Sequence, residues 1–167
     1  MDLGQWILLV VVVVILCFGF VILFGPPWVP TLTPQAKRAL DMIDLKPGDT
    51  LLELGSGDGK ILLDAASRGW DAVGIELNPI LVVISRLRTW RYRKQVKVKW
   101  GNLWQTEKWP KAEGIFVFIL PKHMPKLDKK IAEWHTGSIK LVSFAFTIPG
   151  KKTIRQHKSG VYLYEYK

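Results

Sequence analysis

The sequence predicts an α/β fold, a doubly wound, mostly parallel sheet with a C-terminal antiparallel hairpin, preceded by one N-terminal transmembrane helix. The chain opens on an apolar run over Trp6–Phe24. From Thr33 onward, short apolar segments alternate with helical ones, as in parallel sheets covered on both faces. A glycine-rich loop follows the first predicted strand. The 167 residues therefore divide into an anchor at 1–25, a proline-rich linker at 26–32 and one domain at 33–167.

The apolar run has the length of a membrane span, because a bilayer core of about 30 Å needs about 20 helical residues. No Lys or Arg precedes it, which disfavours a signal peptide, and it has no polar face, which disfavours a buried core helix. Trp6 and Trp28 flank it like interfacial anchors. Since every Lys and Arg follows it, the positive-inside rule predicts a single-pass protein of the cell membrane with a cytoplasmic domain.

Composition excludes two other classes of protein. The single cysteine, Cys17, excludes a fold stapled by internal disulfides. An apolar content of 49% and eight tryptophans exclude a disordered chain. The net charge of +10 makes the chain strongly basic, and all 24 Lys and Arg residues follow the apolar run.

The elements of the domain follow from local signals. Thr33 and Pro34 mark the start of a first helix. Strands are expected at 50–54, 72–76, 96–100, 114–120 and 139–146, with a closing hairpin of 153–157 and 161–166. Further helices are expected at 60–67, after Asn78-Pro79, and over 124–134. The helix after Asn78 has one apolar face at helical spacing, made by Ile80, Val83, Ile84 and Leu87.

The glycine-rich loop Glu53-Leu54-Gly55-Ser56-Gly57-Asp58-Gly59-Lys60 lies between the first strand and its helix. In a Rossmann-like sheet this position holds a nucleotide-like cofactor. The glycine spacing differs from G-x-G-x-x-G, which disfavours a dinucleotide, and no G-K-[ST] follows, which excludes a P-loop. Glu53 and Asp58 make the loop acidic. An acidic loop suits a cationic ligand such as S-adenosylmethionine, which carries a sulfonium and an ammonium group.

Two polar residues at other strand ends complete this candidate site. Glu76 ends the second strand, where a carboxylate can accept both hydroxyls of a ribose. The alternative for Glu76 is a solvated strand-end acid. Asn102 follows the third strand and can reach an adenine edge, or can merely stabilise a turn. Glu76 and Gly57 are expected at the rim of the sheet, so replacing either should not unfold the domain.

These motifs resemble a known superfamily. LELGSGDGK and GIELNP resemble motif I and the acidic loop of the class I, seven-stranded methyltransferases. With the apolar segment, PPWVP, ISRLRTWR and FILPKHMPKL, the chain resembles small membrane-anchored protein-lysine methyltransferases, whose mitochondrial members modify the adenine nucleotide translocase and the c-subunit of ATP synthase. The residues expected to hold S-adenosylmethionine are Glu53, Gly55, Ser56, Gly57, Asp58, Gly59, Glu76, Leu77, Asn78, Asn102 and Leu103.

The sequence departs from this family at two points. Asn102 stands where an acid is often found. The chain between Phe146 and Thr153 is too short for the helix that usually precedes the last hairpin.

The methyl acceptor is expected beside the tip of the fourth strand. Pro121 belongs to this acceptor-side loop, and His123 is the candidate proton acceptor, although a lone histidine is more often a surface residue. The loop is unlike the D-P-P-Y loop of amino-methylating DNA enzymes, which disfavours a nucleobase. We expect a protein-lysine N-methyltransferase that acts on a membrane protein and uses no metal. The alternatives are a lipid, quinone or other small membrane-soluble acceptor, and a non-catalytic methyltransferase-like membrane tether.

Residues 86–99 carry seven bases and no acid, with Trp90 and Tyr92 among them. This basic patch is open to three interpretations: a nucleic-acid site, an anionic membrane surface and a plain solvated face. An anchor close to the domain favours the membrane. The bases at 122–130 and 151–158 are expected to extend the same surface.

Overall fold

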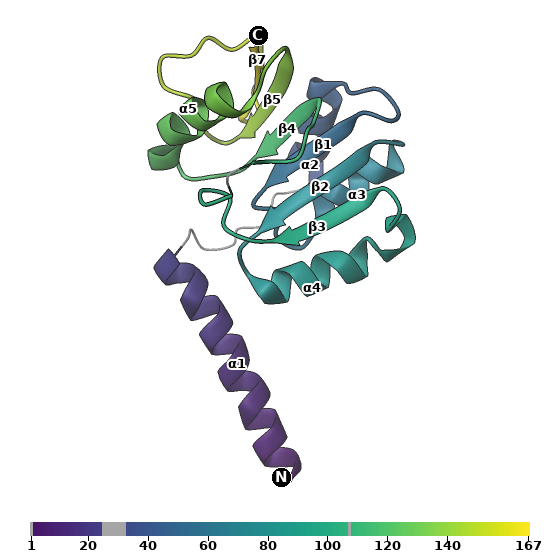
Figure 1. Cartoon of the computed structure of the whole chain (residues 1–167), viewed down its shortest axis with the longest axis vertical. Coiled ribbons are helices and arrows are strands. Elements are labelled where there is room, and N and C mark those ends of the chain that lie inside the picture. Colours follow the sequence, from purple (N-terminus) through teal and green to yellow (C-terminus); the bar gives the residue numbers. More distant parts are fainter. Residues whose placement is uncertain (1, 25–32, 107) are drawn as a thin grey trace.

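A computed structural model describes residues 2–24, 33–106 and 108–167, without the side chains of residues 20–24 and 33 (Figure 1). The helices are α1 Leu3–Phe24, α2 Thr33–Ile43, α3 Lys60–Ser67, α4 Pro79–Arg88 and α5 Met124–Trp134, with short 3₁₀ helices η1 Trp90–Tyr92 and η2 Pro121–His123. The strands are β1 Thr50–Leu54, β2 Asp71–Glu76, β3 Val96–Trp100, β4 Gly114–Val117, β5 Ile139–Phe144, β6 Arg155–His157 and β7 Val161–Tyr166.

The seven strands form one sheet in the order β3-β2-β1-β4-β5-β7-β6. The first five are parallel to their neighbours, whereas β7 runs antiparallel to both β5 and β6. The predicted mostly parallel sheet with a closing hairpin is therefore confirmed. The register places Leu54 of β1 beside Ile75 of β2 and Val117 of β4, so the carboxyl ends of the central strands meet at one edge.

Two apolar cores cover the two faces of the sheet. Side chains from α2, α3 and α4 pack on one face, and side chains from α5 pack on the other. Alternation along β1 separates the two, since Leu51 belongs to the first core and Leu52 to the second. Every buried residue of both cores lies between Ala36 and Tyr166. Among the side chains that the structure describes, neither core therefore includes one from α1.

Three strands are shorter than the sequence indicates, and one of them is β6, which begins at Arg155 and not at residue 153. β4 ends at Val117, which lies beside Leu54, the last residue of β1. β5 ends at Phe144 because Ala145 adopts a left-handed backbone with φ 69°. Between Phe144 and β6, the described chain contains no helix, as its length predicts.

The apolar face predicted for α4 lies on the side of the helix away from the sheet. The residues buried against the sheet are Leu81, Val82 and Ser85, whereas Val83, Ile84 and Leu87 are exposed. The predicted stripe of Ile80, Val83, Ile84 and Leu87 is therefore not the face that packs on the sheet. The helix is apolar on two sides, so periodicity alone does not reveal which side is buried.

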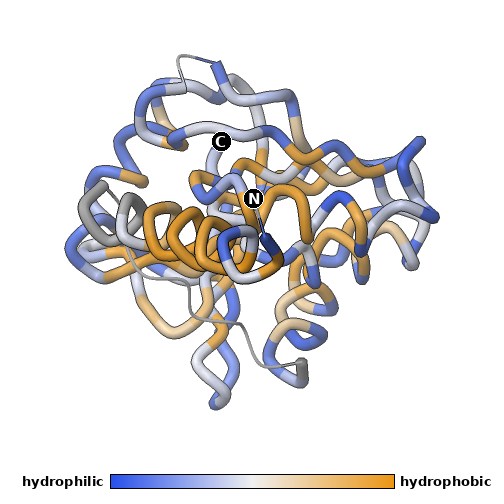
Figure 2. The backbone as a smooth tube through the Cα atoms, turned by 90° about the horizontal axis from the view of Figure 1, so that it is seen from below, coloured by the Kyte–Doolittle hydropathy of each residue, from blue (hydrophilic) through white to orange (hydrophobic). Residues whose placement is uncertain are grey.

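Helix α1 lies outside both cores and projects from the domain (Figure 1), and its turns are coloured as hydrophobic in Figure 2. The expected transmembrane helix is not confirmed, because the described residues include no helix of sufficient length and apolar character to cross a bilayer. Along α1, side chains are described only as far as Gly19. Trp6 is exposed, and Trp28 and the predicted linker at 26–32 lie outside the described residues.

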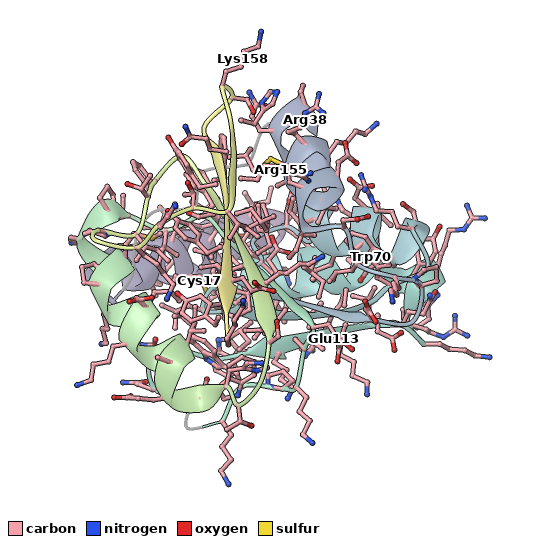
Figure 3. All side chains as sticks on the ribbon, turned by 90° about the horizontal axis from the view of Figure 1, so that it is seen from above. Cys17, Arg38, Trp70, Glu113, Arg155 and Lys158 are labelled. Atoms are coloured by element: carbon pink, nitrogen blue, oxygen red, sulfur yellow. The ribbon has the colours of Figure 1, made fainter. Side chains whose placement is uncertain are left out.

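The bases near the C-terminus lie far from the basic patch. The strand order puts β6 and β3 at opposite edges of the sheet. Figure 3 shows Lys158 at the tip of the β6–β7 hairpin, and Arg155 donates to the carbonyl of Met42 in α2 at 3.0 Å. Lys151 pairs with Asp128 at 2.9 Å. The expectation that residues 151–158 extend the surface of residues 86–99 is therefore wrong.

Candidate active site

The candidate site lies at the edge of the sheet where the parallel strands end. Loops leave the carboxyl ends of β1, β2, β3 and β4 at this edge. The chain passes from β1 outward to β3 and then returns to β4 on the other side of β1. In doubly wound sheets, ligands bind at such a switch point, outside the carboxyl ends of the strands.

The glycines around the loop have two different roles. Gly55, Gly57 and Gly59 all have positive φ, at 80°, 51° and 77°. A Cβ on Gly59 would lie 2.2 Å from the Oγ of Ser85, so this glycine allows α3 to pack on α4. A Cβ on Gly55 would have no neighbour within 4 Å. Gly55 therefore borders open space, where a ligand can approach the backbone.

Glu76 holds the glycine loop against the tip of β2. One carboxylate oxygen accepts the N–H of Gly57 at 2.7 Å, and the other accepts the N–H of Asn78 at 2.8 Å. The residue is only 7% exposed. Burial raises the pKa of its carboxyl, and the backbone hydrogen bonds oppose this rise. Each carboxylate oxygen has two lone pairs, so Glu76 can accept two more hydrogen bonds from a ligand.

Glu53 is the second buried carboxyl of the site. Burial raises its pKa well above 4.5, and the nearby charges of Glu76 and Asp58 act in the same direction. The N–H of Leu62, in the first turn of α3, opposes this rise. Among the described residues, Oε2 of Glu53 and Oγ of Ser56 have no hydrogen-bond partner. Buried polar atoms without partners are uncommon, and two of them beside one loop fit a polar ligand with a cationic donor.

Three predicted cofactor residues make contacts within the protein. Asp58 forms an ion pair with Arg88 of α4 and accepts the N–H of Lys60 at 3.3 Å. Asn78 is fully buried and caps α4, since its Oδ1 accepts the N–H of Ile80 at 2.9 Å. The carbonyl of Leu77 accepts Nε1 of Trp100 at 2.9 Å. These contacts fix the shape of the loops around Glu76.

Asn102 and Leu103 stabilise the loop that follows β3. The Oδ1 of Asn102 accepts the N–H of Trp104 at 2.9 Å, which is the contact of a turn-stabilising residue. The carbonyl of Leu103 accepts Nε1 of Trp109 at 3.1 Å. Lys130 of α5 donates to the carbonyl of Trp104 at 3.3 Å and to that of Thr106 at 2.9 Å. Lys130 is therefore occupied inside the domain and does not extend the basic patch.

The acceptor-side loop begins with η2, whose first residue is Pro121. The ring of His123 lies 5.5 Å from the ring of Trp104, so the loops after β3 and β4 touch. Burial lowers the pKa of His123 below 6.5, and the charges of Lys122 and Lys126 lower it further. A lowered pKa favours the neutral imidazole, which has a ring nitrogen able to accept a proton.

An aromatic cluster that sequence reasoning missed stands between the ends of β4 and β5. The ring of Phe118 lies 4.8 Å from that of Phe144 and 6.3 Å from that of Phe146. The hydroxyl of Ser143 donates to the carbonyl of Phe146 at 2.7 Å and fixes the chain beyond Ala145. Phe118 follows Val117, which pairs with Leu54, so the cluster lies at the level of Gly55. The signal in the sequence was a phenylalanine just beyond each of two adjacent strand ends.

Comparison with known proteins places these features in a family. Residues 53–155 match the ANTKMT methyltransferase domain. The chain belongs to the ANTKMT methyltransferase family. The predicted kinship with class I methyltransferases is thereby confirmed, and the match begins at Glu53 and includes the glycine loop, Glu76 and the acceptor-side loop.

Two named relatives of this ANTKMT-family chain are lysine methyltransferases. It is 34% identical over 125 residues to the ATP synthase c-subunit lysine N-methyltransferase of Xenopus laevis, covering 74% of this chain and 54% of the relative. It is 34% identical over 127 residues to the adenine nucleotide translocase lysine N-methyltransferase of Mus musculus, again covering 74% of this chain and 54% of the relative. The chain thus spans about half the length of these curated relatives.

A solved structure similar to this ANTKMT-family chain has a different named substrate. It is an RNA methyltransferase from Salinibacter ruber in complex with S-adenosyl-L-homocysteine, with a TM-score of 0.75 and 29% identity. The likeness covers 83% of this chain and 92% of that one. In the described part of the chain, no group of three or more His, Cys, Asp or Glu residues is placed to hold a metal ion.

Proposed function

We propose that the protein is an S-adenosylmethionine-dependent protein-lysine N-methyltransferase. The observation that carries the proposal is the pair of buried carboxyls, Glu53 and Glu76, beneath a glycine loop in a domain of the ANTKMT methyltransferase family. The lysine methyltransferase relatives support the reaction, and the Salinibacter ruber structure with S-adenosyl-L-homocysteine supports the cofactor.

In this proposal, Glu76 would hold the ribose of the cofactor and Glu53 would hold its ammonium group, beside the open space at Gly55. Glu76 has lone pairs to spare after holding the backbone of Gly57 and Asn78. Glu53 has an oxygen without a partner among the described residues, and a cationic donor would satisfy it. When bound, S-adenosylmethionine would supply an electrophilic methyl group, whose bond to the positively charged sulfur breaks as the amine nitrogen bonds to the methyl carbon.

The acceptor side has to deliver an uncharged amine. The ring cluster of Phe118, Phe144 and Phe146 offers a partly buried aromatic surface. Removal from water lowers the pKa of a lysine amine and so favours its neutral form. His123 is the candidate to take the proton that the amine loses, since its lowered pKa favours the neutral imidazole. Pro121 sets the start of the loop that carries His123.

The proposed substrate is a lysine of a membrane protein. The relatives are named for two protein substrates, the c-subunit of ATP synthase and the adenine nucleotide translocase, and these names support a protein acceptor. The RNA methyltransferase from Salinibacter ruber favours RNA as the second candidate. The other two candidates are a lipid or quinone acceptor and a non-catalytic membrane tether. Each would give a different result in the methyl-transfer experiment below.

The test is methyl transfer from radiolabelled S-adenosylmethionine into membranes of the source cells, followed by separation into protein, lipid and RNA. We expect the label in protein and, after hydrolysis, in methylated lysine. Phe118→Ala should reduce the transfer, whereas Glu133→Gln, on the exposed side of α5, should not. Label in lipid or RNA would replace the proposed acceptor, and an absence of transfer with intact cofactor binding would indicate a tether.

We further propose that α1 holds the protein at a cell membrane, with the domain on the cytoplasmic side. The large apolar side chains from Leu3 to Leu16 are exposed, and every Lys and Arg of the chain follows α1. Extraction by detergent but not by high salt is expected, with the domain open to protease only from the cytoplasmic side. Recovery of the full chain without detergent would contradict this location.

A further inference from the structure

Helix α4 presents an apolar surface that nothing in the described chain covers fully. Val83 is 55% exposed, Ile84 39%, Leu87 69% and Trp90, in the following η1, 62%. We call these four residues the α4 ridge. Single exposed apolar residues are common, but a continuous row of four large ones on a helix marks an interaction site.

The ridge is not a misplaced core face, because the helix is already fixed on its other side. Ser85 is fully buried and packs closely on Gly59. This close contact opposes rotation of α4 about its own axis. Arg86 donates to the carbonyl of Val98 at 2.9 Å, and Arg88 pairs with Asp58. These contacts hold α4 to β3 and to the glycine loop. The α4 ridge therefore faces outward as a consequence of the fold.

The seven bases of residues 86–99 divide into three groups. Arg86 and Arg88 are engaged inside the domain, as described above. Lys97 and Lys99 alternate with the buried Val96 and Val98, so they lie on the sheet face away from α4. The remaining three, Arg91, Arg93 and Lys94, are exposed just beyond the ridge, and Arg93 lies 5.1 Å from the ring of Trp90.

Apolar residues bordered by bases and a tryptophan fit the interface of an anionic bilayer. We propose that the α4 ridge lies in such an interface, with Arg91, Arg93 and Lys94 on lipid phosphates, so that the domain rests on the membrane by its α4 side. Helix α1, with its exposed apolar side chains, approaches α4, and both lie on the lower side of the domain in Figure 1. RNA phosphates would use the bases but leave the ridge in water. The inference builds on the proposed membrane location.

The test uses the full chain with Cys17→Ser, which removes the single cysteine. Leu87→Cys carries an environment-sensitive fluorophore on the ridge. Glu133→Cys carries it on α5, across the sheet, as the matched control. With vesicles of phosphatidylcholine and phosphatidylglycerol that contain spin-labelled lipid, we expect quenching at position 87 and little at 133. Replacing Arg91, Arg93 and Lys94 by Glu should weaken docking of the ridge by about a hundredfold or more, at about fivefold for each base removed.

Each other outcome overturns the inference. The chain could co-sediment with vesicles and still show equal quenching at positions 87 and 133. This result would support the membrane location and contradict the insertion of the α4 ridge into the bilayer interface. A buried fluorophore at 87 without vesicles would assign the ridge to α1 or, if it depends on concentration, to a second copy. A change in the fluorescence of the label at position 87 with added RNA, but not with vesicles, would assign the surface to nucleic acid. Binding of S-adenosylmethionine, measured on each variant, reports separately on the proposed function.

Discussion

Glu76 links the architecture of the site to its proposed chemistry, because one carboxylate holds two backbone N–H groups and has lone pairs for a ribose. Glu76→Ala should lower the affinity for S-adenosylmethionine by about a hundredfold to twenty-thousandfold, at about 1.5–3 kcal/mol for each of the two charge-assisted hydrogen bonds to the ribose. It should also lower the free energy of unfolding by about 1–3 kcal/mol, because the N–H groups of Gly57 and Asn78 lose their partner. Calorimetry and urea unfolding measure the two effects.

The rim position of Glu76 predicts that Glu76→Ala lowers the stability of the domain without unfolding it. Asp49→Ala is the surface control, since its Oδ2 accepts a single exposed N–H, that of Lys46, at 2.8 Å. A Glu76→Ala protein with wild-type stability would show that the loop is held by other contacts.

Glu53 should make the stability of the cofactor-free protein depend on pH. Its raised pKa means that the folded state binds a proton more tightly than the unfolded state, whose carboxyl titrates near 4.5. Its contribution to stability is therefore full below pH 4.5 and is lost as the pH rises through the folded pKa. Glu53→Gln should raise the free energy of unfolding at neutral pH and flatten its pH profile, while weakening cofactor binding. Urea titrations between pH 4 and 9 measure this, and an unchanged profile would contradict it.

At the scale of elements, the packing of α3 on α4 depends on Gly59. Gly55 and Gly59 have nearly the same φ, 80° and 77°, but only a Cβ at Gly59 would overlap Ser85. Both Gly55→Ala and Gly59→Ala should cost about 1–2 kcal/mol for the left-handed backbone. Gly59→Ala should cost about 1–3 kcal/mol more for the overlap. Thermal or urea unfolding of the pair isolates the packing contribution, and equal losses would show that the helices move apart freely.

For the whole molecule, the two cores predict that the domain folds without α1, because their residues begin at Ala36. A chain that starts at residue 33 should melt cooperatively, close to the melting temperature of the full chain. Calorimetry in matched detergent compares the two. A broad transition in the shortened chain would mean that α1 contributes to the stability of the domain.

Most of the architecture is predictable because local signals bound the elements. Glycine turns set the limits of α3, and the Asn78-Pro79 pair set the start of α4. The orientation of α4 was not predictable, because apolar residues occupy both its sides. The ion pair of Asp58 with Arg88 was not predictable either, because it joins residues far apart in the chain. The cluster around Phe118 required the adjacency of β4 and β5, which only the strand order supplies.

The contact between Gly59 and Ser85 has a consequence for how this family diverges. Neither position is free to accept a larger residue while the other keeps its present size, since a Cβ on Gly59 would also lie 3.1 Å from the Cα of Ser85. The two sites should therefore vary together among descendants of a common ancestor. A lineage that enlarges position 59 should shrink position 85 or shift α4 away from α3. The residue at position 85 of α4 would then depend on the residue at position 59 of the glycine loop, although position 85 has no proposed contact with the cofactor.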